Sequence, residues 1–203
     1  MRSPAVLLAL SLAGVASADR IFIVPTGSKI LLNTIRAEYR YEPSRPTNYS
    51  AYLGMGLTKE IELELITDRF GPDAALGSFN FSYTFLNPIV DTSPGISFGV
   101  QDGLDRTEFG RMYYLALSYR MSQDGRYTEH APVELTLGGG FGRRSGIFVG
   151  LQVPFTWHFR GFVEHDTRRL TTGFEYRVFK GFAVRTMFRY GQTNWAFRYT
   201  YRF

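Results

Sequence analysis

The chain has no cysteine, only three histidines and, beyond its first eighteen residues, no uncharged apolar run long enough for a membrane-spanning helix. Without cysteine there can be neither a disulfide framework nor a thiolate metal site. The basic residues are almost all arginine and are scattered along the chain, which excludes the contiguous basic stripe of a nucleic-acid-binding protein. We therefore expect no cofactor, no metal and no nucleic-acid partner.

The beginning of the chain has the three parts of a secretory signal. Met1 and Arg2 form a short positive region, Ala5 to Val15 is apolar, and Ala16-Ser17-Ala18 is a small-x-small cleavage site. The apolar run is shorter than the ~18–20 residues needed to span a bilayer as a helix. The sequence predicts a cleaved signal peptide over residues 1–18 and one exported domain over residues 19–203.

The last residues alternate strictly between aromatic and polar side chains. One face carries Trp195, Phe197, Tyr199, Tyr201 and Phe203, and the other carries Ala196, Arg198, Thr200 and Arg202. Aromatic rings opposite arginines suit a strand with one face in lipid and the other toward a wet interior. The terminal aromatics Tyr199, Tyr201 and Phe203 resemble the C-terminal signature by which barrel-insertion machinery recognises bacterial outer-membrane barrels.

The same period of two recurs along the whole chain and is interrupted by Gly, Pro, Asn and Asp clusters. It predicts strands over 29–41, 48–56, 60–67, 78–86, 96–101, 110–121, 132–141, 146–154, 159–165, 169–178, 182–190 and 194–203. Most are about nine to eleven residues long, which is the length of a tilted strand across an outer membrane. Twelve strands are expected, with ten or fourteen also compatible with the weak pattern around residues 155–161.

Along these strands an apolar, strongly aromatic face alternates with an ionic one. The predicted ionic lining consists of Arg36, Glu38, Arg40, Glu62, Glu64, Glu134, Glu175, Arg177, Arg185, Arg189, Arg198 and Arg202. Aromatics make up 16% of the chain, as membrane-interface girdles require. A soluble β-protein would turn its apolar face inward, and periodicity alone cannot separate the two arrangements.

The aromatic outer face, the charged mid-strand positions and the glycines at inward positions favour the membrane barrel. The sequence thus predicts an all-β, transmembrane, antiparallel up-and-down barrel in a bacterial outer membrane. Its outer surface would contact lipid, and an even number of strands would place both termini in the periplasm. The opposed charges could either fill a narrow barrel or set a transverse field across a pore. The pattern does not define an oligomeric state.

One histidine is a candidate for catalysis. His165 is flanked by Glu164 and Asp166 near a predicted strand end, and a general base needs a partner of this kind. No neighbouring serine supplies a nucleophile, and no hydrolase motif surrounds it. The expectation is therefore a non-enzymatic protein with no catalytic residue, and an outer-membrane enzyme that uses His165 is the alternative.

Several segments resemble the YjbH-type outer-membrane barrels associated with bacterial exopolysaccharide production. These segments are Ile23–Gly27, Gly56–Leu63, Gly146–Gly150, Phe162–Asp166 and Gly173–Arg177. The chain is shorter than named members, and His165 stands where that pattern usually has an aromatic residue. The resemblance implies a role in envelope or exopolysaccharide biogenesis or export, with polysaccharide or envelope proteins as partners. A narrow, porin-like passive channel for small solutes or ions is the alternative.

Overall fold

The protein is described by a computed structural model that covers residues 20–21, 23–69, 71, 74–122, 132–189 and 191–203. The predicted signal peptide over residues 1–18 lies outside the described residues. No helix in the described ranges is long and apolar enough to cross a bilayer.

The described residues form twelve strands. They are β1 (Thr34–Tyr41), β2 (Tyr49–Gly56), β3 (Ile61–Arg69), β4 (Leu76–Leu86), β5 (Gly95–Gln101), β6 (Met112–Met121), β7 (Val133–Gly142), β8 (Gly146–Pro154), β9 (Phe159–His165), β10 (Leu170–Phe179), β11 (Phe182–Arg189) and β12 (Gln192–Arg202).

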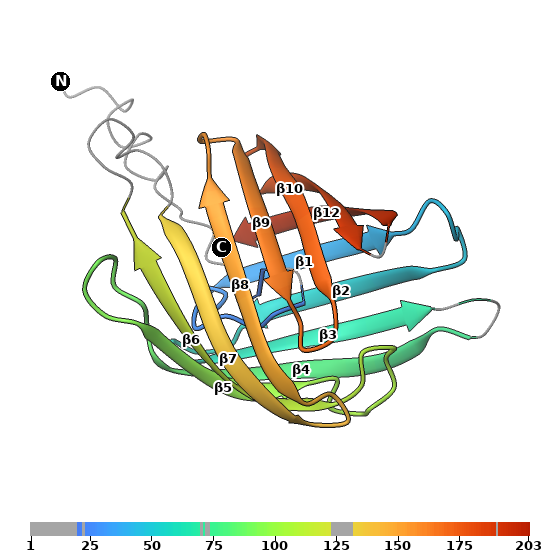
Figure 1. Ribbon diagram of the computed structural model, residues 1–203, viewed down its shortest axis with the longest axis horizontal. Helices are drawn as coiled ribbons and strands as arrows, with labels where there is room; N and C mark the ends of the chain where they lie inside the picture. Colours follow the sequence, from blue (N-terminus) through green and yellow to red (C-terminus); the bar gives the residue numbers. More distant parts are fainter. Residues whose placement is uncertain (1–19, 22, 70, 72–73, 123–131, 190) are drawn as a thin grey trace.

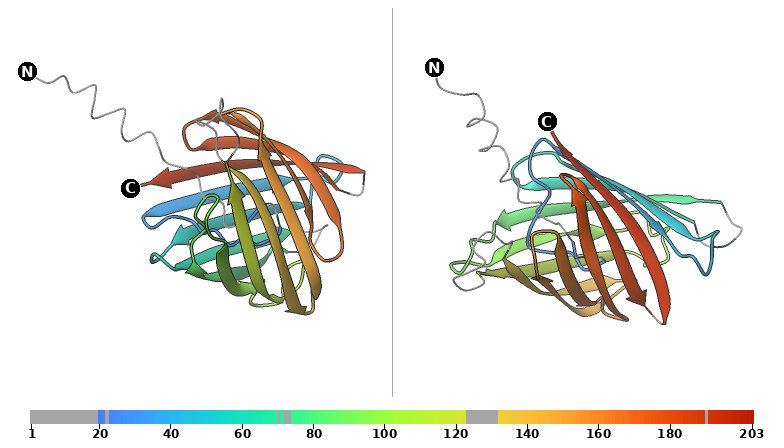
Figure 2. Two further views of the ribbon diagram at one scale, coloured as in Figure 1. Left: turned by 60° about the vertical axis from the view of Figure 1, so that its left-hand side comes forward. Right: turned by 90° about the horizontal axis from the view of Figure 1, so that it is seen from above.

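Each strand pairs in antiparallel register with its neighbours in sequence, and β1 pairs with β12 to close the wall. Figures 1 and 2 show this single closed barrel. Closure leaves no strand edge unpaired, which is the condition for a sheet to exist in hydrocarbon. The predicted twelve-stranded, up-and-down transmembrane barrel is confirmed.

We call the end where β1 begins and β12 finishes the terminal end. The opposite end, called the loop end, carries the connections 42–48, 102–111, 143–145 and 166–169.

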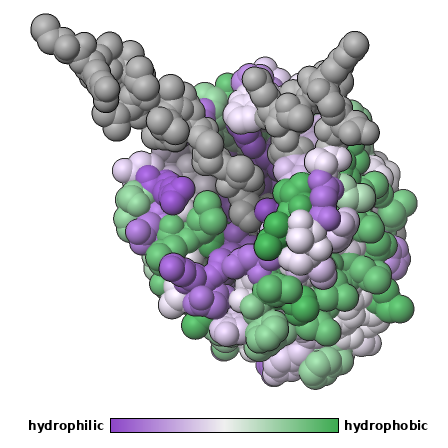
Figure 3. Space-filling view, turned by 90° about the vertical axis from the view of Figure 1, so that its left-hand side faces the viewer, coloured by the Kyte–Doolittle hydropathy of each residue, from purple (hydrophilic) through white to green (hydrophobic). Residues whose placement is uncertain are grey.

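Side chains alternate between the two faces of the wall as the period of two requires. In β3, Glu62 and Glu64 are buried in the lumen. Leu65, the residue after Glu64, points to the outside and is 53% exposed. The outer face is apolar along most strands, and Figure 3 shows hydrophobic residues over one flank of the terminal end with hydrophilic ones near its middle. This is the inverse of a soluble barrel and matches a wall that contacts lipid.

Aromatic rings gather near both ends of the outer wall. Tyr113 and Phe141 stack with ring centroids 5.3 Å apart near the loop end. Near the terminal end, Phe179 stacks on Phe182 with centroids 5.2 Å apart, and Phe155 is 54% exposed. Aromatic residues near both ends of the wall are what the two interfaces of a bilayer select, although exposed Phe98, Phe174 and Phe197 also lie at mid-strand.

The beginning of the first strand was predicted wrongly. The pattern placed it at Lys29, but β1 begins at Thr34, and Lys29 and Ile30 lie buried inside the barrel. Asn33 has a φ of 60°, a left-handed conformation that breaks the strand and lets the chain turn into the lumen.

Candidate functional site: the barrel lumen

The lumen wall contains a hub of three arginines around one carboxylate. Glu175 on β10 lies 2.6 Å from Arg185 Nε, 2.8 Å from Arg198 Nη2 and 3.0 Å from Arg160 Nε, and its side chain has no exposed surface. Strands β9, β10, β11 and β12 contribute these side chains, because inward positions on adjacent strands lie side by side in the register. A buried carboxylate is tolerated here only because several cations surround it.

This hub continues across the closure between β12 and β1. Arg185 Nη1 also lies 3.5 Å from Glu38 Oε2, and Glu38 Oε1 lies 2.6 Å from Arg40 Nε. One continuous ionic network therefore links the first and last strands. The network lies across the seam that closes the barrel, where Glu38 is the register partner of Arg198.

A second group of charges lies on β1 and β3. Glu64 accepts hydrogen bonds from Arg36 Nη2 and Arg20 Nη2, both at 2.9 Å, and from Asn80 Nδ2 at 2.8 Å. Glu62 lies 3.8 Å from Arg36 Nη2. Glu62 and Glu64 thus lie in the lumen, whereas Glu60, two residues earlier, is exposed in a turn.

The remaining predicted lining residues lie apart from these groups. Glu134 pairs with Arg120 at 2.9 Å and Arg189 pairs with Asp166 at 2.7 Å. Arg177 is half-buried at the terminal end with its guanidinium carbon 5.7 Å from the Trp157 ring centroid. Arg202 is exposed and does not line the lumen, because β12 extends past the start of β11 there and pairs only with Thr34 of β1.

Sequence reasoning missed several lumen residues. Arg120, Arg160 and Glu164 lie at inward positions of β6 and β9 and could have been found by extending the same parity. Arg20 could not have been found in this way, because it lies before the first strand and belongs to no alternating pattern.

The most consequential feature is the chain before β1, which runs inside the barrel. We call residues 20–21 and 23–31 the lumenal segment. All of it but Leu31 is buried, and it folds back on itself through a hydrogen bond from Ile21 N to Val24 O at 3.0 Å and a bridge between Arg20 and Pro25. Figure 1 shows it in blue within the barrel.

Wall side chains bind the backbone of the lumenal segment. Glu164 accepts from Ile23 N at 3.0 Å and from Val24 N at 3.2 Å, and Glu62 accepts from Ile30 N at 2.7 Å. Other polar wall side chains bind the segment in the same way: Ser118 accepts from Gly27 N, Ser97 donates to Thr26 O, Gln101 donates to Ile23 O and Arg185 donates to Ile21 O. These partners substitute for the ladder bonds that the segment lacks.

Inward glycines make room for the segment. A Cβ at Gly150 would lie 2.3 Å from Ile21 Cδ1, and a Cβ at Gly54 would lie 2.8 Å from Ile30 Cδ1. The sequence predicted glycines at inward positions as a mark of a membrane barrel. At these two positions they are recesses that receive side chains of the lumenal segment.

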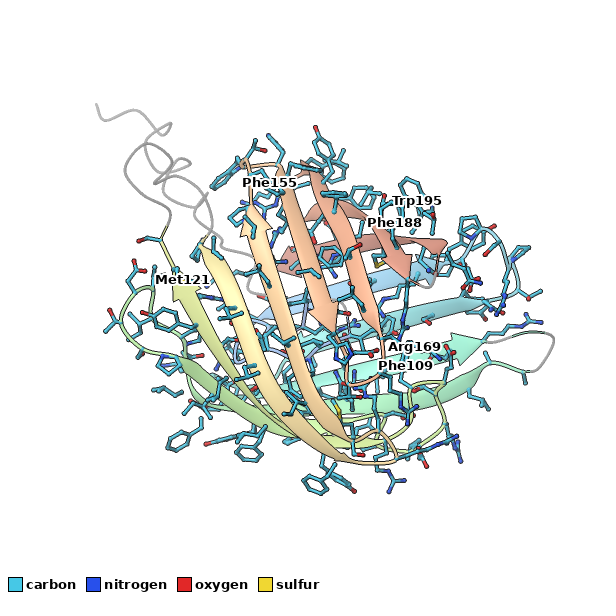
Figure 4. All side chains as sticks on the ribbon, viewed as in Figure 1. Phe109, Met121, Phe155, Arg169, Phe188 and Trp195 are labelled. Atoms are coloured by element: carbon cyan, nitrogen blue, oxygen red, sulfur yellow. The ribbon has the colours of Figure 1, made fainter. Side chains whose placement is uncertain are left out.

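At the loop end, a cavity of about 330 Å³ opens above the segment. We call it the mouth cavity. It is lined by Arg40, Tyr41, Glu42, Arg45, Asn48, Tyr49, Ser50, Glu108, Phe109, Arg169, Arg189, Gln192 and Asn194. Four arginines and two glutamates line the cavity, so its charge is net positive. Figure 4 shows Arg169 and Phe109 next to each other here, and Phe188 and Trp195 pointing outward.

The floor of the mouth cavity is held by the loop 102–111, which turns into the barrel. Asp102 Oδ2 accepts from Thr107 N at 2.8 Å and from Thr107 Oγ1 at 2.7 Å, and Oδ1 accepts from Arg106 N at 2.9 Å. Burial alone would raise the pKa of Asp102, but these bonds and one with Ser78 outweigh it and lower that pKa. Phe109 then packs on the cluster that contains Ile21 and Ile23.

The histidine candidate does not assemble a catalytic group. His165 lies on the outward face at the end of β9, whereas Glu164 and Asp166 on either side of it are buried inside. A period of two sends sequence neighbours to opposite faces, so adjacency in the chain separated these groups. Within the described ranges, no set of three or more His, Cys, Asp or Glu side chains is placed to hold a metal ion.

No protein-family model matches this chain, and no curated protein matches it. Two solved structures share its architecture. A KdgM porin matches with a TM-score of 0.53 at 12% identity, and a KdgM porin in complex with disordered oligogalacturonate matches with a TM-score of 0.51 at 13% identity. Each covers 84% of this chain and 99% of the porin chain. At this identity the likeness shows a shared fold, that of outer-membrane porin barrels.

Proposed function

We propose that this protein is an outer-membrane channel of porin type that passes small anionic solutes. The observation that carries the proposal is the positive mouth cavity above an arginine- and glutamate-lined lumen. Porin neighbours with the same barrel support it.

The mouth cavity favours anions on electrostatic grounds. Arg40, Arg45, Arg169 and Arg189 come from β1, the 42–48 connection, the 166–169 connection and β11, so positive charge surrounds the opening. Rings of arginine at a constriction favour anion entry, and low-dielectric walls focus their field. Each of these arginines also has a carboxylate partner: Arg40 pairs with Glu38, Arg45 with Glu42, Arg169 with Glu108 and Arg189 with Asp166. The pairs of Arg45 and Arg169 are the longer and more exposed ones, so these two guanidinium groups are the ones that an entering anion can engage.

Acidic oligosaccharides are the first solutes to test. Guanidinium groups form paired hydrogen bonds with carboxylates, and Tyr41, Tyr49 and Phe109 offer apolar surface beside them. The cavity lies within the ~300–1,000 Å³ typical of small-molecule sites. One structural neighbour was solved with oligogalacturonate, an acidic oligosaccharide. The exopolysaccharide role and the YjbH resemblance stay predictions, as do periplasmic termini and the absence of enzymatic activity.

Single-channel recording in planar bilayers tests the proposal. The purified protein should show unitary openings whose reversal potential in a salt gradient indicates preference for anions. Arg169→Glu and Arg45→Glu should each reduce that preference, because both line the mouth cavity. Arg143→Glu is the matched control, since Arg143 lies at the same end, is exposed and does not line the cavity.

Oligogalacturonate added on the side of the loop end should interrupt the current, and Arg169→Glu should weaken this block. Openings that prefer cations, or equal effects of Arg169→Glu and Arg143→Glu, would refute the anion-channel proposal.

A further inference from the structure

We propose that the lumenal segment is a displaceable plug that closes this channel. The inference rests on the proposed channel function and assigns its regulation. In the described residues, the segment fills the lumen between the terminal end and the mouth cavity, so solute passage requires it to move.

The segment is bound to the wall as a ligand would be. Its described residues form no ladder with a barrel strand, and the first bridge to the wall is the isolated one of Leu32 with Gly56, just after the segment. Its anchors are side chains of β3, β5, β6, β9 and β11, which surround it on several sides. The barrel strands pair with one another through their backbones and close without the segment. The segment can therefore leave without opening the sheet.

Apolar contacts and the glycine recesses add to these polar anchors and to the ion pair of Arg20 with Glu64. Ile21 and Ile23 pack with Phe162 and Met187, and Val24 packs with a second cluster that contains Phe148. The recesses at Gly54 and Gly150 fix its position along the wall. Burial of these apolar side chains makes the closed state the ground state.

The surface that the plug would vacate suits water and ions. The groups that bind it are Glu62, Glu164, Ser118, Gln101 and Arg185, all polar or charged. Once the segment leaves, water can satisfy them. The exit is toward the terminal end, because the segment joins β1 there and Asn33 with its left-handed φ provides the turn.

A disulfide lock tests the plug. Ile21 Cγ1 lies 3.5 Å from the Cβ that a side chain at 150 would carry, so a sulfur in its place is close enough for a disulfide. The chain has no other cysteine, so the double variant Ile21→Cys/Gly150→Cys can form only this intramolecular bond. When oxidised, the channel formed by the double variant should open at least tenfold less often than the same channel after reduction. The opening frequency of the Ile21→Cys single variant should not change when the oxidant is added.

A second pair of variants loosens the plug instead. Glu164→Ala removes the acceptor of Ile23 N and Val24 N and should raise open probability severalfold. Thr171→Ala is the matched control, because Thr171 is the register partner of Glu164 and is equally buried, while its hydroxyl has no hydrogen-bond partner among the described residues.

Seating of the segment is measured separately by maleimide labelling. In the Ile21→Cys variant the thiol should react far more slowly than in Ser145→Cys, whose position is exposed at the loop end. Adding Glu164→Ala should speed the reaction.

The outcomes separate the two proposals. If the oxidised lock conducts like the reduced protein, the plug is overturned and the channel stands. If labelling is slow but every variant, including Glu164→Ala, is electrically silent, the channel is overturned, and the gating role with it. If the thiol of Ile21→Cys labels as fast as that of Ser145→Cys, the segment does not occupy the lumen.

Discussion

Replacing Glu175 by glutamine should destabilise the barrel strongly. The amide keeps the size of the side chain but removes the negative charge shared by Arg160, Arg185 and Arg198, which lie 2.6–3.0 Å from it in a fully buried site. Breaking a buried ion pair from one side costs about 3–5 kcal/mol, because the opposite charge stays buried without compensation. Arg185 keeps Glu38 at 3.5 Å and the Ile21 carbonyl at 2.8 Å, which places the cost near the lower limit, about 3 kcal/mol.

The assay is urea unfolding of the protein refolded into lipid vesicles, followed by tryptophan fluorescence. With a urea m-value of about 1–3 kcal/mol per M, a loss of about 3 kcal/mol lowers the midpoint by about 1–3 M. Glu108→Gln is the matched control: its side chain is 42% exposed and pairs with Arg169 at 3.4 Å. An exposed pair of this kind contributes about 0–1 kcal/mol. Equal midpoints for the two variants would refute the view that the buried Glu175 hub is essential for stability.

Three further changes follow from the wall and the loop. Leu65→Arg puts a charge on the lipid-facing side of β3 and should cost about 2–4 kcal/mol in vesicles; an unchanged urea midpoint would contradict a lipid-facing position. A Cβ added at Gly138 would lie 2.1 Å from Phe148 Cζ. Gly138→Val should therefore overpack the lumen and lower the urea midpoint through a loss of about 1–3 kcal/mol in the free energy of unfolding. The lowered pKa of Asp102 means that its ionised form stabilises the fold above the unfolded pKa of about 3.9, and that this contribution is lost as pH falls through the folded value. Asp102→Asn should therefore lower the midpoint at pH 7, and this loss should shrink as pH falls below the unfolded pKa; a loss that stays constant on acidification would refute this role.

The wall of the barrel could be predicted from the sequence because each strand contains its own signal. The eighth and ninth strands were predicted with the bounds that the structure shows, Gly146–Pro154 and Phe159–His165. A period of two also assigned the inward face correctly for Glu38, Glu175 and Arg185, because strand geometry sends alternate side chains to one side.

The lumenal segment could not be predicted in this way. Its partners lie far away in sequence: Ile23 binds Glu164 and Gly27 binds Ser118, and no local pattern encodes such pairs. Lys29 and Ile30 look like the start of a strand because alternation describes side chains and says nothing of where backbone hydrogen bonds go. The mouth cavity was missed for the same reason, since its arginines come from four separate parts of the chain.

Depth-dependent fluorescence quenching tests most directly whether the apolar wall contacts lipid. Leu65→Trp, with Trp157 and Trp195 replaced by phenylalanine, places one indole at the middle of β3 on the outer face. Lipids brominated deep in the acyl chains should quench it strongly, and aqueous iodide should quench it weakly. Strong quenching by iodide with none by brominated lipid would contradict a membrane-spanning barrel.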